Sequence, residues 1–318
     1  MTLSVNIKAL EIFREFMKNP VPFAVNVEKH PSGAVIIDAG IKASGGYAAG
    51  KIITEICLGG FGAASIMSHT YGDLSLPTVH VETDYPAIST LGSQFAGWRV
   101  KVDKYFAMAS GPARALALKP KELYEKIGYK DKSENAVIVL EADAPPTPEA
   151  LKYMAEECEV KVRNLSVVVA PTQCQSGSVQ ISGRIVETGI HKLTEIGFDP
   201  KRILYGSGYA PIAPIHPKST RAMGRTNDSL LYGGVTFYNV DYEDDEKLKE
   251  MVVKVPSSTS RNYGKPFYDT FKEAEFDFFK IDPGLFAPAV ITVNNVRTGS
   301  TFTAGYINPD LLKKSFGL

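Results

Sequence analysis

Hydrophobic residues recur at helical and strand-like spacings along most of the chain. Near the amino terminus, apolar residues three or four positions apart predict an amphipathic helix over residues 3–17. Short apolar, often β-branched runs between turn residues predict buried strands. These runs cover residues 34–39, 78–83, 136–141, 166–170 and 289–294. Helical patterns at 47–57, 113–118 and 149–158 alternate with them, so the sequence predicts an α/β fold.

The most informative stretch covers residues 173–196, after the strand predicted at 166–170 and a polar turn at 171–177. Its apolar positions predict an amphipathic helix, and they are Val179, Val186, Ile190 and Leu193. Arg184 and Glu187 are three positions apart and therefore share one helix face. A solvated charged face is the simplest interpretation of that spacing. However, α/β proteins often bind ligands where a strand passes through a Gly- and Ser-rich turn into a helix.

The length of 318 residues is sufficient for two hydrophobic cores. The order of elements also repeats weakly, pairing 34–40 with 166–172, 48–53 with 181–186, 106–115 with the region of 221–225, and 135–143 with 234–242. Alternating short elements produce some of this by chance, but such repetition is typical of internal duplication. We therefore expect two α/β domains with a ligand cleft between them. The first should span 1–145, with 285–318 returning to it, and the second 146–284.

Composition excludes several classes of protein. Lys and Arg together number 35, as do Asp and Glu, so the charge balance suggests neither nucleic acid nor a membrane as partner. The three cysteines form no C-x-x-C pair and the five histidines no H-x-x-x-H pattern, so we expect no disulfide framework and no metal site. The charged amino terminus is not a signal peptide, and no apolar run is long enough for a membrane span. We expect a cytoplasmic protein.

A possible phosphate loop, G-x-x-x-x-G-K, runs from Gly45 to Lys51 between a predicted strand and a predicted helix. The next residue is Ile52 where a Ser or Thr would bind magnesium, which argues against nucleotide hydrolysis. Binding of a phosphate without hydrolysis needs only glycine N–H groups and the lysine. A non-catalytic phospho-ligand binding protein is therefore one alternative function.

Two further features contain possible functional groups. Cys174 lies just before a helix start, which would lower its pKa, but no histidine is near it in the sequence, so a small buried residue is the preferred interpretation. The polar cluster 219–228 contains Arg221 and Arg225, which could bind a carboxylate or phosphate or cap the local structure. No G-x-S-x-G motif is present, so a common α/β serine hydrolase has no support.

Three stretches together resemble the methenyltetrahydromethanopterin cyclohydrolase family: QSGSVQISGRIVETGIHKL at 175–193, RILYGSGYAPIAPI at 202–215 and the RAMGRTND loop at 221–228. The resemblance spans essentially the whole chain, and these motifs are specific to that family. It implies a soluble enzyme of one-carbon metabolism in methanogenic archaea and their relatives. It also implies a two-domain subunit with a cleft, a homotrimer, and no metal or redox cofactor, since tetrahydromethanopterin is the substrate carrier.

The family's catalytic arginine and glutamate, spaced R-x-x-E, fall on Arg184 and Glu187. The implied reaction adds water to the methenyl-tetrahydromethanopterin cation and gives formyl-tetrahydromethanopterin and a proton, reversibly. A carboxylate beside the amidinium-like carbon would favour the cation and take a proton from the attacking water. Proximity to the motifs suggests further substrate-binding residues, namely Gln173, Ser176, Arg221, Met223, Arg225 and Asn227. Lys51 would bind the anionic tail of the pterin.

One more alternative is a purely structural trimer, in which the glycines of 177–189 serve only to pack the helix. Loss of the near-ultraviolet absorbance of the methenyl compound on adding protein would distinguish the enzyme from both alternatives.

Overall fold

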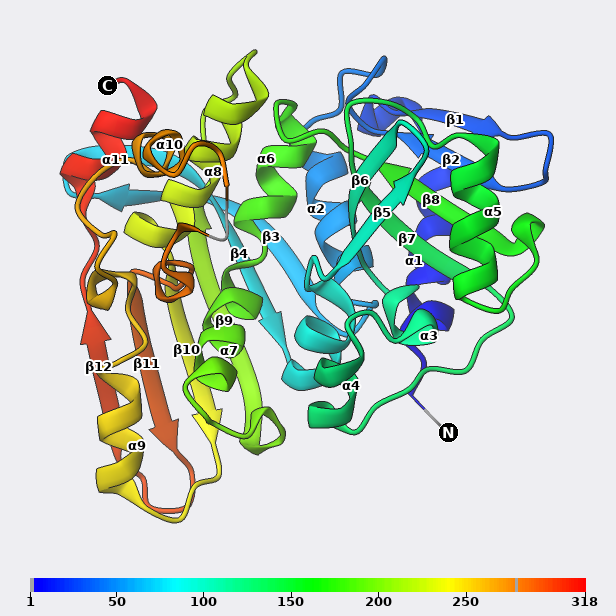
Figure 1. The fold of residues 1–318 in the computed structure, drawn as a ribbon. Coiled ribbons are helices and arrows are strands. Elements are labelled where there is room, and N and C mark those ends of the chain that lie inside the picture. Colours follow the sequence, from blue (N-terminus) through cyan, green and yellow to red (C-terminus); the bar gives the residue numbers. More distant parts are fainter. Residues whose placement is uncertain (1–2, 278–279) are drawn as a thin grey trace. The chain divides into compact units, whose positions relative to one another are not determined.

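The computed structural model describes residues 3–277 and 280–318 (Figure 1). The chain divides into two compact units. The first unit contains the chain up to Ala63 and Ala87–Gln180, and the second contains Ala64–Pro86 and Ile181–Leu318. Each unit has one six-stranded sheet with both parallel and antiparallel neighbours. The predicted two-domain α/β class is confirmed, and the cleft between the domains stays a prediction.

The first sheet has the order β1-β2-β8-β7-β6-β5. Its strands are β1 (Asn26–Lys29), β2 (Val35–Asp38), β5 (Trp98–Val102), β6 (Tyr105–Ser110), β7 (Ala136–Glu141) and β8 (Leu165–Val169). The central strand β8 is parallel to both β2 and β7, and the outer pairs are antiparallel. The central strands are runs of Val, Ile and Leu, because a parallel sheet is buried on both faces.

Helices cover both faces of this first sheet (Figure 1). On one face, α1 (Val5–Lys18) and α2 (Tyr47–Cys57) pack in a cluster that includes Ile37 of β2. On the other face, α5 (Pro148–Glu157) packs in a cluster that includes the preceding residue, Ile36. The side chains of consecutive strand residues thus point to opposite faces of the sheet, as the two-residue period of a strand requires.

Shorter elements complete the first unit. They are the 3-10 helices η1 (Val21–Phe23) and η3 (Val162–Asn164), the π-helix η2 (Ala87–Gln94), and the α-helices α3 (Arg114–Ala117) and α4 (Lys121–Ile127). Helix α6 (Gln175–Ser182) begins in the first unit, and its last two residues belong to the second. The π-helix η2 ends in a stretch of small residues that precedes β5. The residues of η2 from Ser89 onward are buried, and such packing stabilises a helix form that has no strong sequence signal.

The second sheet has the order β12-β11-β10-β9-β4-β3. Its strands are β3 (Ala63–Tyr71), β4 (Leu74–Thr83), β9 (Ile203–Pro211), β10 (Val235–Val240), β11 (Val290–Asn295) and β12 (Thr301–Gly305). Strands β10 and β11 are parallel, while β4 with β9, β9 with β10, and β11 with β12 are antiparallel.

The helices of the second unit pack on this sheet and on one another (Figure 1). They are α7 (Ile185–Glu195), α8 (Ser219–Gly233), α9 (Asp245–Val252), α10 (Phe267–Glu273) and α11 (Pro309–Phe316), with short 3-10 helices at Pro200–Arg202, Ser257–Thr259 and Pro283–Leu285. Aromatic and aliphatic side chains join α8, α10 and α11 in one cluster, which includes Tyr232, Phe267, Phe271, Leu312 and Phe316.

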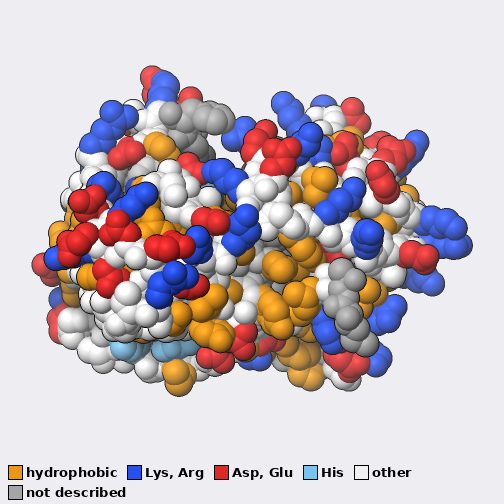
Figure 2. Space-filling view, turned by 90° about the horizontal axis from the view of Figure 1, so that it is seen from below, with side chains coloured by type: hydrophobic (Ala, Val, Ile, Leu, Met, Phe, Trp, Pro, Cys, Tyr) orange, Lys and Arg blue, Asp and Glu red, His pale blue; other side chains and the backbone are white. Residues whose placement is uncertain are grey.

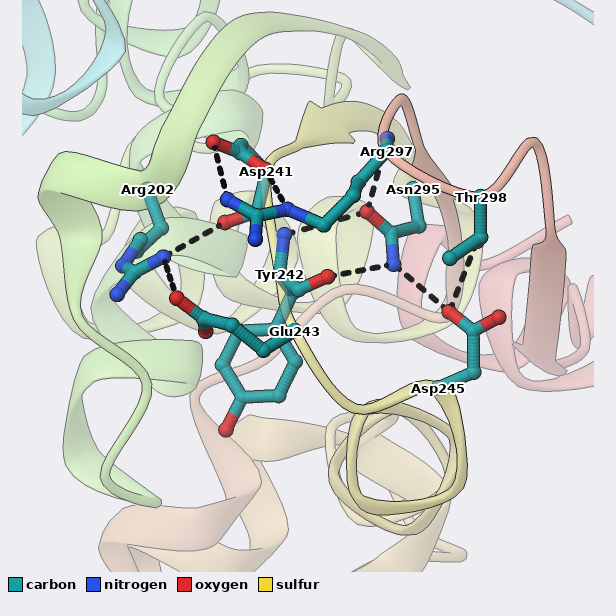
Figure 3. A network of polar contacts seen from close by, with 8 residues as sticks. All are labelled: Arg202, Asp241, Tyr242, Glu243, Asp245, Asn295, Arg297 and Thr298. Carbon is teal, nitrogen blue, oxygen red and sulfur yellow. Dashed lines mark hydrogen bonds and ion pairs between the residues drawn. The ribbon is translucent and has the colours of Figure 1, made fainter.

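A polar network fixes one end of the second sheet (Figure 3). Asn295, which is fully buried, donates through Nδ2 to the carbonyl of Tyr242 (2.9 Å) and to Oδ1 of Asp245 (2.7 Å). Its Oδ1 accepts the Tyr242 N–H at 3.2 Å. Arg297 forms a two-pronged ion pair with Asp241, at 2.6 and 3.1 Å. The network therefore ties the loop after β10 to the turn between β11 and β12.

The unit boundaries differ from the predicted domains. Residues 146–180 belong to the first unit because β8 pairs with β2 and β7. Residues 285–318 belong to the second unit because β11 pairs with β10. The expected repeat also fails in detail: 34–40 and 166–172 contain neighbouring strands of one sheet, and 106–115 contains a strand where 221–225 is helical.

Candidate active site

Arg184 and Glu187 lie at the start of α7. Residues 173–196 form two helices rather than the single one predicted, because α6 ends at Ser182. The N–H of Arg184 donates to the carbonyl of Ile181 at 3.0 Å, a tight three-residue turn that ends α6. The preceding Gly183 has a low helix propensity, which favours a break here.

The two residues lie at the beginning of the new helix. Arg184 is the N-cap of α7, and Glu187 is the third residue of its first turn. Both are buried, with 8% and 6% of their surface exposed. The start of a helix carries a partial positive charge, so an acidic residue is favourable in the first turn, where Glu187 lies.

Three glycines allow this first turn of α7 to lie close to the sheet. A Cβ atom at Gly206 would lie 3.0 Å from Val186, and one at Gly208 would lie 3.3 Å from the same side chain. At Gly234 a Cβ atom would lie 2.3 Å from Ile185. Larger residues would push the helix away, so the RILYGSGY segment of the family motif positions Glu187 indirectly.

Tyr238 of β10 is hydrogen-bonded to the same turn of α7. Its fully buried hydroxyl donates to the carbonyl of Val186 at 2.8 Å. A Cβ atom at Gly189 would lie only 2.2 Å from that hydroxyl, so glycine is required for the close approach. Burial raises the pKa of Tyr238 well above its ordinary value, and the negative charge of Glu187 acts in the same direction. The tyrosine therefore stays protonated and remains a donor.

The turn before α6 and the first residues of α6 lie in the first unit and are held by local hydrogen bonds. Ser176 donates its hydroxyl to the carbonyl of Ala39, and Gln173 donates Nε2 to Oδ1 of Asp143 at 3.0 Å. Burial raises the pKa of Cys174, although hydrogen bonds from Ser176 and neighbouring backbone groups oppose the shift. The lowered thiol pKa expected at a helix start is therefore not found, and Cys174 is a small buried residue.

The possible phosphate loop is engaged in packing. The N–H of Gly45, whose φ is +60°, donates to the carbonyl of Ala24 at 2.9 Å. Lys51 pairs with Glu55 one turn along α2, with 3.1 Å between Nζ and Oε1. A Cβ atom at Gly50 would lie 2.4 Å from Val179, so this glycine serves close contact. These contacts give no support to a phospho-ligand binding protein that uses the loop.

The cluster around Arg221 is helical, not a loop, because it forms the first half of α8. Arg221 and Arg225 lie one turn apart and line the same pocket. Asn227 donates Nδ2 to the carbonyl of Met223 at 2.8 Å, a bond within the helix. Met223 packs partly buried against the aromatic cluster of α8, α10 and α11. Gly224 allows α8 to approach Tyr268, to which a Cβ atom would come within 2.8 Å.

The structure thus distributes the predicted residues over both units. Gln173, Ser176 and Lys51 lie in the first, whereas the second contains Arg184, Glu187, Arg221, Met223, Arg225 and Asn227. Sequence reasoning missed Tyr238, whose role depends on a strand pairing about 50 residues beyond α7. The only local signal was the glycine at 189 inside a helical pattern.

Positive and negative side chains are mixed on the surface, as the equal numbers of the two kinds in the sequence suggest. Lys and Arg side chains are interspersed with Asp and Glu over the face shown in Figure 2. Within residues 3–277 and 280–318, no three His, Cys, Asp or Glu side chains are grouped as a metal site would require. No helix in this described part of the chain has the length and hydrophobicity of a membrane span.

Comparison with known proteins confirms the resemblance over nearly the whole chain. The sequence model of a family described as Cyclohydrolase (MCH) matches residues 4–316. The methenyltetrahydromethanopterin cyclohydrolase of Methanothermobacter marburgensis is 49% identical, over 99% of this chain and 100% of the relative. Proteins of the same name from Methanococcoides burtonii and Methanocaldococcus jannaschii are 49% and 47% identical; each alignment covers 99% of this chain, and 99% and 98% of the relatives. The chain therefore belongs to the cyclohydrolase (MCH) family.

Proposed function

We propose that this protein catalyses the reversible addition of water to the methenyl-tetrahydromethanopterin cation, giving formyl-tetrahydromethanopterin and a proton. Family membership over residues 4–316 supports the activity. The observation that carries the residue assignment is the buried arginine and glutamate at the N-cap and first turn of α7. We assign Glu187 as the general base and acid, and Arg184 as the residue that orients it.

In the first step, a water oxygen forms a bond to the methenyl carbon. Glu187 accepts a proton from that water, so the product is a neutral carbon that carries a hydroxyl group and both nitrogens. The electron pair of the former C=N⁺ bond returns to nitrogen. The carboxylate also stabilises the substrate cation before attack, because the two charges are opposite and the site is buried.

In the second step, the protonated Glu187 gives its proton to the departing nitrogen. The carbon–nitrogen bond breaks and its electron pair stays on that nitrogen. The hydroxyl group becomes the formyl carbonyl and loses its proton to solvent, so one proton is released overall. These steps involve neither electron transfer nor a phosphate leaving group, and we propose that no metal or redox cofactor takes part.

The variant Glu187→Gln tests this assignment directly, because it keeps the shape and removes the base. We expect the rate of hydration, followed by loss of the methenyl near-ultraviolet absorbance, to fall roughly 100-fold or more. Glu195→Gln is the matched control, since this residue is exposed at the other end of the same helix. Near-normal turnover by Glu187→Gln would contradict the assignment while leaving the proposed reaction testable with the wild-type protein.

We also propose substrate contacts from Gln173, Ser176, Met223 and Asn227, and binding of the anionic tail by Lys51. The side chain of Lys51 is 39% exposed, so it can reach a ligand without breaking the core. A Lys51→Ala variant should raise KM and leave kcat nearly unchanged. The family resemblance further supports a cytoplasmic homotrimer, which light scattering in solution would reveal as three times the mass of one chain.

A further inference from the structure

We infer that a pocket in the second unit, formed by α8, α10, α11 and the segment before α8, binds a doubly charged oxyanion of the phosphate type. Its volume is about 120 Å³, and the side chains that matter are His216, Arg221, Arg225, Tyr268, Asp269 and Lys314. The inference concerns binding alone and therefore holds or fails independently of the proposed reaction.

The charges around the pocket suit a dianion. Arg221, Arg225 and Lys314 are cations, and Asp269 is the one carboxylate among the lining residues. With a neutral His216, the residues that line the pocket carry two more positive than negative charges. A phosphate monoester carries about −1.5 to −2 at neutral pH, so it would balance the lining. A single carboxylate would leave part of the excess uncompensated.

The guanidinium of Arg221 has a fixed orientation and can still bind an anion. Its guanidinium carbon lies 4.3 Å from the centre of the Tyr268 ring, a cation–π contact that fixes the plane of the group. Neither Arg221 nor Lys314 forms an ion pair with any residue in the described ranges 3–277 and 280–318. A fixed planar guanidinium with available N–H groups matches the oxygens of phosphate, and Lys314 adds a movable point charge.

Arg225 is anchored more firmly than Arg221. It donates to the carbonyls of Pro214 (3.3 Å), Ile215 (3.2 Å) and Phe316 (2.9 Å). Burial lowers the pKa of Arg225, and the charge of Arg221 one turn away lowers it further. Two guanidiniums held this close repel each other, and a bound anion would remove that unfavourable interaction.

His216 provides an internal reporter of the pocket. Its Nδ1 accepts the N–H of Lys218 at 3.0 Å, which leaves Nε2 for a ligand or solvent. Burial lowers the pKa of His216, and the charges of Arg225 and Arg221 act in the same direction. A bound dianion would oppose these charges and raise the pKa.

The size of the pocket limits what enters it. Sites for whole drug-sized ligands usually have volumes of about 300 Å³ or more. A volume of about 120 Å³ corresponds to roughly four water molecules, which is enough for one anionic group such as phosphate. The oxyanion is therefore either free phosphate or the phosphate of a larger ligand, including the tail of the proposed substrate.

Calorimetric titration of the full chain with sodium phosphate at low ionic strength tests the inference. We expect saturable binding by the wild-type protein and a loss of about tenfold or more for Arg221→Gln and for Lys314→Gln. Lys313→Gln is the matched control, because this neighbouring lysine pairs with Asp73 and does not line the pocket. NMR titration of His216 should show its pKa rising when phosphate is present.

Enzyme kinetics then distinguish the two sources of the oxyanion. If the substrate supplies it, phosphate competes with methenyl-tetrahydromethanopterin, and Arg221→Gln raises KM without changing kcat. If free phosphate is the ligand, it binds without affecting KM. Either result supports the pocket. The inference is overturned if phosphate shows no saturable binding at millimolar concentrations, or if it binds equally well to the Arg221 and Lys314 variants.

Discussion

Asp228 carries a carboxyl group that the fold buries completely between three helices. Its Oδ1 accepts the N–H of Phe267 at 2.9 Å, and its Oδ2 accepts the hydroxyl of Ser315 at 2.6 Å. Burial raises the pKa of Asp228 to about 8, although the hydrogen bonds from Ser315 and Phe267 oppose the shift. The folded chain therefore holds a proton here that the unfolded chain releases near pH 4.

The raised pKa of Asp228 makes the free energy of unfolding depend on pH. A raised folded pKa means that the stabilising contribution is complete below about pH 4 and is lost as the pH rises towards about 8. We predict that the free energy of unfolding falls across this range and that Asp228→Asn, which keeps an acceptor, flattens the fall. Urea denaturation at several pH values measures it, with the exposed Asp310→Asn as control. An unchanged slope in Asp228→Asn would contradict this origin.

Gly189 and Tyr238 form a second residue-scale unit. Alanine at 189 gains about 1 kcal/mol of helix propensity, but its Cβ atom would lie 2.2 Å from a hydroxyl that is fully buried and bonded to Val186. We predict that the steric overlap with Tyr238 outweighs the gain in helix propensity. Gly189→Ala should therefore lower the free energy of unfolding by about 1–3 kcal/mol.

A double-mutant cycle separates this overlap from helix propensity. Tyr238→Phe removes the hydroxyl and leaves the nearest ring carbon 3.0 Å from the added methyl group. Gly189→Ala should therefore cost less in the Tyr238→Phe background than in the wild type. Gly46→Ala is the control, because nothing lies within 4 Å of a Cβ atom there. Equal costs in both backgrounds would show that the hydroxyl is not the obstacle.

At the scale of elements, Arg184 and Glu187 both lie at the start of α7. If Arg184 supports the carboxylate of Glu187 as proposed, its removal should move the acid-side decline of kcat/KM to a higher pH. We predict that Arg184→Ala with Glu187→Ala is little worse than Glu187→Ala alone. The measurement is kcat/KM of all four proteins across pH. Additive losses with an unmoved acid side would mean that Arg184 acts elsewhere, for example on the pterin.

Elements with a continuous apolar pattern were predictable from the sequence, and those decided by packing were not. Strand β7 coincides with the predicted 136–141, and α5 differs by one residue at each end from the predicted 149–158. The break at Arg184 was missed because the apolar stripe continues across it at Val179 and Val186. Helix α8 was missed because its first half is rich in Ser, Thr, Arg and Asn, which usually favour loops.

The same limit applies to the sites. Arg184 and Glu187 could be named because a short motif contains both. The oxyanion pocket could not, because Tyr268 and Lys314 join Arg221 from about 50 and 90 residues further along the chain. Likewise, the role of Tyr238 depends on the register of β10 with β9.

At the scale of the whole molecule, the domain prediction failed because the chain crosses between the units at 63, 86 and 180. A segment boundary read from composition cannot reveal that β3 and β4, early in the sequence, complete a sheet made mainly of later strands. Each unit nevertheless has its own sheet and its own hydrophobic clusters. This arrangement implies that damage to one core can be confined to that unit.

Asn295 allows the separate stability of the two units to be tested, because its side chain satisfies buried backbone groups at one end of the second sheet. Asn295→Ala leaves the N–H and the carbonyl of Tyr242 without these partners, so we predict a loss of about 1–3 kcal/mol in the free energy of unfolding. Asn239→Ala is the control, since that half-buried residue makes one side-chain bond, to Asn294, within the described chain.

Hydrogen exchange followed by mass spectrometry then locates the effect of Asn295→Ala. If the units are energetically separable, peptides from β10, β11 and β12 lose protection, while peptides from β2, β7 and β8 keep theirs. Because those first-unit strands are the buried centre of their own sheet, they exchange only when that sheet opens. An equal loss of protection in both sets would mean that the chain unfolds as one cooperative body despite its two sheets.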